Sequence, residues 1–180
     1  MKRRNLVLIG FMGSGKTSMG VKLSYRRQVM VEDTDKLIER REGRSISEIF
    51  AREGEEYFRQ QETALLMELE EGRYRRIYSV GGGTPVREEN RRLLRRLGVV
   101  IYLRARPETI YERLKGDTSR PLLCCADPLG RIRELMESRS PAYEECADII
   151  VDVDGKTVED ILDYIERETD AFFKGYEQGI

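Results

Sequence analysis

The 180-residue sequence contains no histidine. This absence excludes catalytic triads of the Ser/His/Asp type and metal sites built on imidazole. Cysteine is scarce as well, with three residues, of which Cys124 and Cys125 are adjacent. A sparse and odd count does not fit a secreted disulfide framework, and two neighbouring thiols without further ligands make a poor zinc site. The function therefore has to be sought in other residue types.

The chain also lacks a strong net charge and long hydrophobic runs. Lys and Arg total 32 and Asp and Glu total 33, so the net charge of −1 creates no basic field for nucleic acid. The apolar runs reach about five or six residues, whereas a membrane helix needs roughly 20. The basic start, residues 1–4, leads into a short apolar run that ends at glycine and has no cleavage pattern. We expect a cytoplasmic protein that binds neither nucleic acid nor membrane.

Short apolar runs alternate with segments of helical pattern along the whole sequence. The length fits a single domain, residues 1–180, with a frayed tail at about 175–180. The runs that suit buried strands are 6–9, 29–31, 77–80, 99–103 and 149–151. Helices are expected at 16–27, 36–41, 45–54, 55–71, 88–97, 107–116, from 127 onward, and at 157–172. This alternation predicts an α/β fold in three layers, with a parallel sheet covered on both faces and ligands beyond the carboxyl ends of its strands.

Residues 10–17, Gly-Phe-Met-Gly-Ser-Gly-Lys-Thr, match the phosphate-binding pattern G-x-x-x-x-G-K-[ST]. Glycines let successive backbone N–H groups turn toward phosphate oxygens, and the helix that follows adds a positive end. Lys16 can reach the β- and γ-phosphates, and the Thr17 hydroxyl can ligate Mg²⁺. The alternative is a glycine-rich turn that binds nothing, but a strand is expected before the pattern and a helix after it. The sequence therefore predicts an ATP-binding P-loop.

The sequence has no guanine-reading N-K-x-D stretch, which argues against a GTPase. Residues 127–130, Asp-Pro-Leu-Gly, imitate a D-x-x-G switch motif, but they follow an irregular segment instead of a strand. We interpret Asp127 as a helix N-cap and Pro128 as a first-turn proline. The phosphate must then pass to another class of acceptor.

Six short runs, taken in order, resemble the bacterial-type shikimate kinases over about residues 5–165. They are the P-loop, Asp33-Thr34-Asp35, Glu55-Glu56-Tyr57-Phe58-Arg59, Gly81-Gly82-Gly83, Arg120-Pro121-Leu122-Leu123, and Arg139 before Pro141 and Tyr143. The resemblance implies ATP-dependent transfer to the 3-hydroxyl of shikimate, in a fold similar to that of nucleoside monophosphate kinases. It also implies a five-stranded parallel sheet, a helical substrate-binding part at about 34–62 and a mobile lid at about 114–126.

The resemblance assigns acceptor-side roles to five residues. Arg59 and Arg139 match the carboxylate clamp of the family, a task that suits a planar guanidinium with two parallel hydrogen bonds. Asp35 matches the acid that contacts the acceptor hydroxyls and takes the proton from the attacking one. Gly82 and Gly83 match substrate contacts, because glycine lets a ligand approach the backbone closely.

On the donor side, Asp33 matches the acid near the Mg²⁺ shell, with Thr17 as the second ligand. Arg120 matches the lid arginine that closes over the transferring phosphate, and Arg113 matches a position that stacks on adenine. The expected nucleotide contacts are Gly13, Ser14, Gly15, Lys16, Thr17, Ser18, Arg113 and Arg120. The expected catalytic residues are Lys16, Asp35 and Arg120.

Some of these residues also have structural interpretations. Asp33 or Asp35 can cap the next helix, and Phe50 and Phe58 can belong to the core instead of lining the substrate ring. The segment 25–28 lacks the glycine that usually ends the first helix in this family.

Two alternative functions stay open at this point, a gluconate kinase and a nucleotide-binding regulatory module without turnover. A non-catalytic module has no need of a complete acceptor site, which argues against the second. A monomer is expected, because the sequence shows no heptad seam and no left-over apolar helix face.

Overall fold

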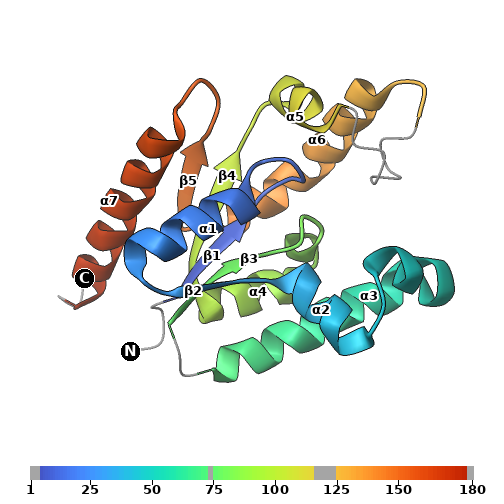
Figure 1. Cartoon of the computed structure of the whole chain (residues 1–180), viewed down its shortest axis with the longest axis horizontal. Coiled ribbons are helices and arrows are strands. Elements are labelled where there is room, and N and C mark those ends of the chain that lie inside the picture. Colours follow the sequence, from blue (N-terminus) through green and yellow to red (C-terminus); the bar gives the residue numbers. More distant parts are fainter. Residues whose placement is uncertain (1–4, 73–74, 116–124, 178–180) are drawn as a thin grey trace.

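The computed structural model describes residues 5–72, 75–115 and 125–177, and within these ranges one parallel sheet of five strands forms the centre of the molecule (Figure 1). The strand order is β2-β3-β1-β4-β5. The strands are β1 (Asn5–Ile9), β2 (Met30–Asp33), β3 (Arg76–Ser79), β4 (Gly98–Arg104) and β5 (Ile149–Asp152). The expected parallel sheet is confirmed.

Position in the sheet explains the composition of the strands. All five residues of β1 are buried, and so are the first six of β4. These strands are covered on both faces, which is why their sequences are apolar runs without alternation. In contrast, β2 lies at the edge of the sheet, pairs with β3 alone among the described strands, and leaves Met30 64% exposed.

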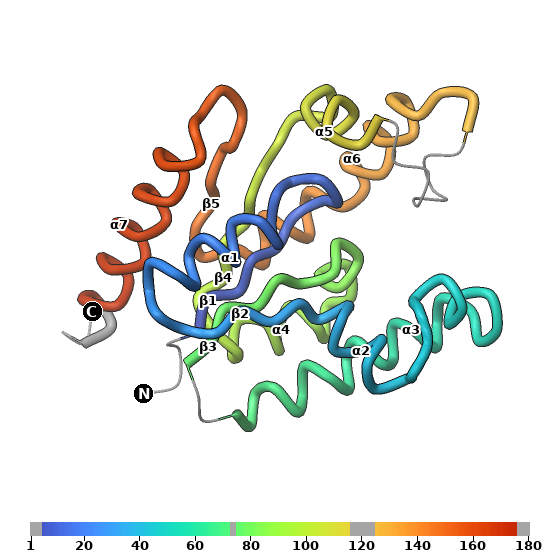
Figure 2. Tube along the Cα trace, viewed as in Figure 1, coloured from blue at the N-terminus to red at the C-terminus, as the bar shows by residue number. Residues whose placement is uncertain are grey.

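Helices cover both faces of the sheet (Figures 1 and 2). α1 and α7 contact each other and the sheet on one face, and α4 and α6 do so on the other. α2 and α3 form a pair on the side of the molecule away from α7 (Figure 2). The helices are α1 (Lys16–Arg27), α2 (Thr34–Glu42), α3 (Ile46–Glu71), α4 (Glu88–Leu97), α5 (Pro107–Leu114), α6 (Pro128–Cys146) and α7 (Val158–Glu177), with a 3-10 turn η1 (Thr84–Val86). Within these residues, no helix is both long and apolar enough to cross a membrane.

The buried side chains form two clusters. The main core lies between the sheet and its covering helices and includes Leu8, Leu94 and Ile101. A small second core fills the space between α2 and α3, and consists of Ile38, Ile49, Phe58 and Leu65. Leu69 packs against both clusters. The helical pair is therefore attached to the main body through α3 but has its own apolar centre.

Local capping chemistry sets several helix ends as expected. The Ser45 hydroxyl accepts from the Glu48 N–H, and the Glu48 carboxylate accepts from the Ser45 N–H at 2.8 Å, which forms the expected capping box. Asp127 caps α6 by accepting from the Gly130 N–H at 2.9 Å. Gln28, with φ of 51°, takes the left-handed position at the end of α1 that glycine usually fills.

Three expected boundaries differ from the structure. The helices expected at 45–54 and 55–71 form one element, broken at Gly54 by a φ of 84° without an intervening loop. α2 begins at Thr34, two residues before the expected start, because Asp33 caps it. α7 continues to Glu177, since Phe172 and Phe173 pack against the core, so the tail expected to fray from residue 175 is helical up to 177.

Candidate active site

The phosphate-binding loop follows the central strand β1 and leads directly into α1. Gly15 is the N-cap of α1 and has a φ of 99°, a conformation that disfavours any side chain. Gly10 has a φ of 143°, and a Cβ atom there would lie 2.7 Å from the carbonyl oxygen of Leu103. The backbone conformation of the loop therefore requires glycine at these two positions. In this conformation the N-terminus of α1 points into the space that the loop encloses.

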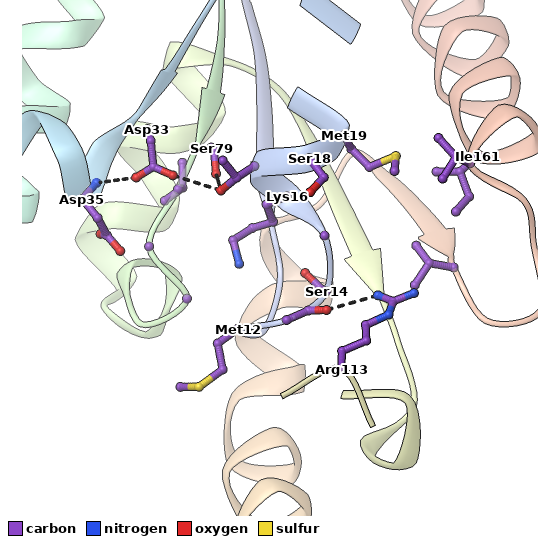
Figure 3. Close-up of a pocket in the computed structure, with 18 of the residues that line it drawn as sticks. Met12, Ser14, Lys16, Ser18, Met19, Asp33, Asp35, Ser79, Arg113 and Ile161 are labelled. Atoms are coloured by element: carbon purple, nitrogen blue, oxygen red, sulfur yellow. Dashed lines mark hydrogen bonds between the residues drawn. The ribbon is translucent and has the colours of Figure 1, made fainter. Parts of the chain in front are cut away.

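A cavity of about 500 Å³ opens beyond the carboxyl ends of the strands, where the sequence places the ligands (Figure 3). The P-loop residues line it, Asp33, Asp35 and Ser79 lie at one end, and Ile161 lies at the other (Figure 3). The expected nucleotide residues Gly13, Ser14, Gly15, Lys16, Thr17, Ser18 and Arg113 all line it. Arg120 falls outside the described residues, as does most of the expected lid at 114–126.

Cationic side chains hold the P-loop from two sides. The Lys16 Nζ donates to the carbonyl oxygens of Gly10 at 2.9 Å and Phe11 at 3.0 Å. Arg113, reaching in from α5, donates to the carbonyl oxygen of Gly13 at 3.1 Å (Figure 3). The hydroxyl of Ser14 is buried and has no hydrogen-bond partner among the described residues. A buried polar group of this kind suits a site that receives a polar ligand.

Three oxygen-bearing side chains meet at one corner of the cavity. The Thr17 hydroxyl donates to the Asp33 carboxylate at 3.1 Å and lies 3.2 Å from the Ser79 hydroxyl. The described residues contain no cluster of three or more carboxylate, thiol or imidazole ligands that could cage a metal. One carboxylate with hydroxyls does fit Mg²⁺, which keeps several waters and shares its shell with substrate phosphates. The donor set therefore fits the ion that the sequence predicts here.

Asp33 and Asp35 have different environments despite their proximity. Asp33 accepts from the Asp35 N–H at 3.1 Å and caps α2, so the helix cap is Asp33. Asp35 projects into the cavity, and its Oδ1 is buried without a hydrogen-bond partner in the part of the chain that the structure describes. Burial, reinforced by the negative charges of Asp33 and Glu62, raises the pKa of Asp35 to about 6. Gly81 leaves room for it, because a Cβ atom there would lie 2.6 Å from Asp35 Oδ1.

Arg59 projects from α3 toward residues 81–83, which we call the acceptor loop. Its guanidinium donates to Glu62 at 2.7 Å and to Glu55 at 2.9 Å. A Cβ atom on Gly83 would clash with the guanidinium, so glycine is what admits Arg59 to this place. Glu62 is almost fully buried, and burial raises the pKa of its carboxyl.

Arg139 reaches the same region from α6. Its guanidinium carbon lies 5.8 Å from the centre of the Phe11 ring, beside the P-loop. One turn further along α6, Tyr143 donates to the carbonyl oxygen of Gly82 at 2.5 Å. Arg59 thus lies against Gly83, whereas Arg139 lies beside Phe11 of the P-loop, one helical turn from the tyrosine that is bonded to Gly82.

Several site residues escaped the sequence analysis. Glu62 lies three residues after Arg59 on the same helix, a spacing that signals a partner. Ser79 and Lys156 line the cavity without any recognisable motif. For Phe58 the sequence left both a core position and a ligand contact open, and the side chain is only 4% exposed and belongs to the second core. Its ring packs against Phe50 with the centres 5.1 Å apart.

A phosphate-binding loop on the central strand of a 2-3-1-4-5 parallel sheet, with a buried carboxylate and arginines close by, defines a P-loop kinase of small molecules. The chain belongs to the shikimate kinase family, because the sequence model described as "Shikimate kinase" matches residues 12–170.

Curated relatives carry the same name. The shikimate kinase of Symbiobacterium thermophilum is 43% identical over 160 residues, which cover 88% of this chain and 91% of the relative. The shikimate kinase of Neisseria meningitidis serogroup C is 43% identical over 164 residues, covering 90% of this chain and 96% of the relative.

Solved structures agree with the fold. The shikimate kinase from Acinetobacter baumannii in complex with shikimate superposes with a TM-score of 0.86 at 34% identity, covering 93% of both chains. A gluconokinase from Sinorhizobium meliloti reaches a TM-score of 0.59 at 16% identity, covering 99% of this chain and all of the other. The second likeness shows a shared fold alone.

Proposed function

We propose that this chain transfers the γ-phosphate of ATP to the 3-hydroxyl of shikimate, yielding shikimate 3-phosphate for aromatic amino-acid biosynthesis. The observation that carries this proposal is the position of Asp35. Its buried carboxylate lies in the cavity between the P-loop and the acceptor loop. A proton acceptor placed between a phosphate-binding loop and a loop in contact with an arginine suits an acceptor that has both a hydroxyl and a carboxylate.

The donor half binds and orients ATP. The P-loop amides and the N-terminus of α1 bind the phosphates, Lys16 leaves its carbonyl partners for the β- and γ-phosphates, and Arg113 stacks on adenine. Thr17 and Asp33 would hold Mg²⁺. When bound, the ion neutralises phosphate charge that develops during transfer.

The acceptor half orients shikimate. Arg59 and Arg139 bind its carboxylate, while the N–H groups of Gly82 and Gly83 donate to its oxygens. Asp35 accepts the proton of the 3-hydroxyl as that oxygen bonds to the γ-phosphorus and the bond from phosphorus to the β-phosphate oxygen breaks. With a pKa of about 6, Asp35 is ionised at neutral pH and can take this proton.

Arg120 completes the proposed site. On the lid, its guanidinium would cover the transferring phosphate and stabilise its charge. A closed lid also excludes water, which would otherwise compete with the acceptor hydroxyl for the phosphate.

The proposed reaction can be tested by measuring ADP release with ATP and Mg²⁺ and with shikimate, gluconate or no acceptor. We expect turnover with shikimate only. Turnover with gluconate and not with shikimate would overturn the proposed acceptor. Tight ATP binding without any turnover would instead favour the regulatory module.

The organisation of the chain around this site stays a prediction. We expect one domain with a substrate-binding part at 34–62 and a lid at 114–126, acting as a monomer in the cytoplasm. Sedimentation of the purified chain at several concentrations would test the monomer directly, because self-association would raise the apparent mass with concentration.

A further inference from the structure

The backbone carbonyls from Gly81 to Val86 are all occupied by hydrogen bonds from within the chain. Two are bonded by backbone N–H groups of the turn itself, Thr84 to Gly81 and Val86 to Gly83, each at 3.1 Å. The other four receive side-chain donors. These are Tyr143 to Gly82 at 2.5 Å, Asn90 to Thr84 at 3.0 Å, and Arg91 to both Pro85 and Val86 at 3.0 Å.

The N–H groups of the acceptor loop show the opposite pattern. The Gly81 N–H donates to the Thr34 hydroxyl at 3.1 Å. The N–H groups of Gly82 and Gly83 make no hydrogen bond within the part of the chain that the structure describes. Each of these carbonyls already accepts a hydrogen bond, whereas the two N–H groups are donors without a partner among the described residues. Such a loop favours an anionic or hydroxylated ligand, which can accept from both N–H groups.

Tyr143 is the donor that fixes the centre of this loop. Its side chain is fully buried, and its ring packs on Tyr102 with the centres 5.1 Å apart. Burial raises the pKa of Tyr143 to about 12, although the charge of Arg139 acts in the opposite direction, so the phenol remains protonated and donates at any working pH. Gly82 is also packed against the P-loop, because a Cβ atom there would lie 3.4 Å from the Gly10 carbonyl oxygen.

We propose that Tyr143 is a positioning residue for the acceptor, which acts through its hydrogen bond to the Gly82 carbonyl. The Gly82 carbonyl shares its peptide plane with the Gly83 N–H, so this bond restrains that plane and keeps the Gly83 N–H directed to the acceptor. The neighbouring plane, which carries the Gly82 N–H, is held by the bond from the Thr84 N–H to the Gly81 carbonyl. The bond from Tyr143 also ties the acceptor loop to the helix that carries Arg139, four residues before Tyr143 on the same face of α6. The inference rests on the proposed function, since it concerns how that acceptor is held.

Tyr102 offers a matched control, because it is a buried tyrosine in the same aromatic pair and no hydrogen bond joins it to the acceptor loop. Tyr143→Phe and Tyr102→Phe each remove one buried hydroxyl and leave the ring.

The measurements are kcat and KM for shikimate and for ATP, the shikimate dissociation constant by calorimetry, and the thermal midpoint. We expect Tyr143→Phe to raise the KM and dissociation constant of shikimate about tenfold, the size expected when one buried hydrogen bond is lost. The KM for ATP should change less than about twofold, and Tyr102→Phe should leave both constants near the wild-type values.

Three outcomes would overturn the inference. One is an unchanged shikimate constant in Tyr143→Phe, and another is an equal rise in both variants, which would make the effect one of packing. Loss of the folded state in Tyr143→Phe alone would assign the hydroxyl to stability. The wild-type protein separates this inference from the proposed function, because failure of the wild type to phosphorylate shikimate refutes the function itself, whatever the variants do.

Discussion

In the proposed reaction, the protonation state of Asp35 decides whether the acceptor hydroxyl can be activated. The Asp35 pKa of about 6 arises first from burial and then from the charges of Asp33 and Glu62, with Lys16 and Arg59 acting in the opposite direction. A base with this pKa is ionised at neutral pH and protonated in mild acid. We expect kcat/KM for shikimate to fall about tenfold per pH unit below about pH 6, measured with saturating MgATP.

The variant Asp35→Asn tests the same group through stability. The pKa of Asp35 lies above its ordinary value of 3.8, so folding favours the protonated carboxyl. The associated stability is fully present below about pH 3.8 and is lost as the pH rises through about 6. At pH 8, Asp35→Asn should therefore raise the free energy of unfolding by roughly 1–3 kcal/mol while phosphoryl transfer is largely lost. A wild-type kcat/KM that stays constant from pH 7 to pH 5 would contradict the role of Asp35 as the base. The raised pKa would be contradicted if Asp35→Asn gained less stability over the wild type at pH 8 than at pH 4.

Substitution of Lys16 and of Arg139 should have different kinetic effects, because Lys16 belongs to the ATP side of the proposed site and Arg139 to the acceptor side. Arg139→Ala removes a proposed carboxylate contact and should mainly raise the KM for shikimate, by about tenfold or more. Lys16→Ala removes charge stabilisation at the transferring phosphate and should mainly lower kcat, by at least about a hundredfold. Steady-state kinetics with both substrates varied checks both. An unchanged KM for shikimate in Arg139→Ala would remove this residue from the clamp.

At the scale of elements, local chemistry made much of the fold predictable. The Ser45 capping box, the Asp127 cap and the P-loop between strand and helix each depend on residues within a few positions of one another. The misjudged boundaries depend on distant contacts. α7 extends because Phe172 and Phe173 reach the core, and α3 continues past Gly54 with only one residue outside helical geometry.

In the candidate site, too, the features that depend on nearby residues were predictable and those that depend on distant contacts were not. The P-loop follows from its own motif and the Asp pair from the family resemblance, but the contact between Tyr143 and Gly82 joins residues 61 positions apart. No local pattern announces such a contact, so the sequence indicated Tyr143 only as part of a family resemblance. Burial of Phe58 is likewise set by the packing of α2 on α3, and burial of Glu62 by its contacts with Thr84 and Gly81.

The second core between α2 and α3 gives an element-scale prediction. Ile49 is fully buried there, whereas Leu94 is fully buried in the main core. Ile49→Ala should loosen the helical pair that carries Arg59, at a cost of about 2–4 kcal/mol, and raise the KM for shikimate severalfold with little change for ATP. Leu94→Ala should lower the thermal midpoint without this selectivity. If Ile49→Ala raised the KM for shikimate and the KM for ATP equally, the packing of α2 on α3 would not act on the acceptor side alone.

At the scale of the whole molecule, the strand order separates the two halves of the site. β1, which leads to the P-loop, is central and paired on both sides, whereas β2, which ends at Asp33, is an edge strand paired with β3 alone. Edge strands open at lower free energy than central ones. We expect amide hydrogen exchange in β2 to be at least about tenfold faster than in β1 and β4, and to slow when shikimate and a nucleotide are added. Equal exchange rates in β1 and β2 would contradict this ranking.

The edge position of β2 also affects the highest temperature at which the protein can be active. The two carboxylates of the proposed mechanism, Asp33 and Asp35, lie at the end of this edge strand, while most of the main core lies between the other strands and their helices. Local unfolding of β2 would abolish the activity while most of the molecule is still folded. The activity would return on cooling. The upper working temperature of the protein would then lie below its melting temperature, and the supply of its own substrates would help to set that limit.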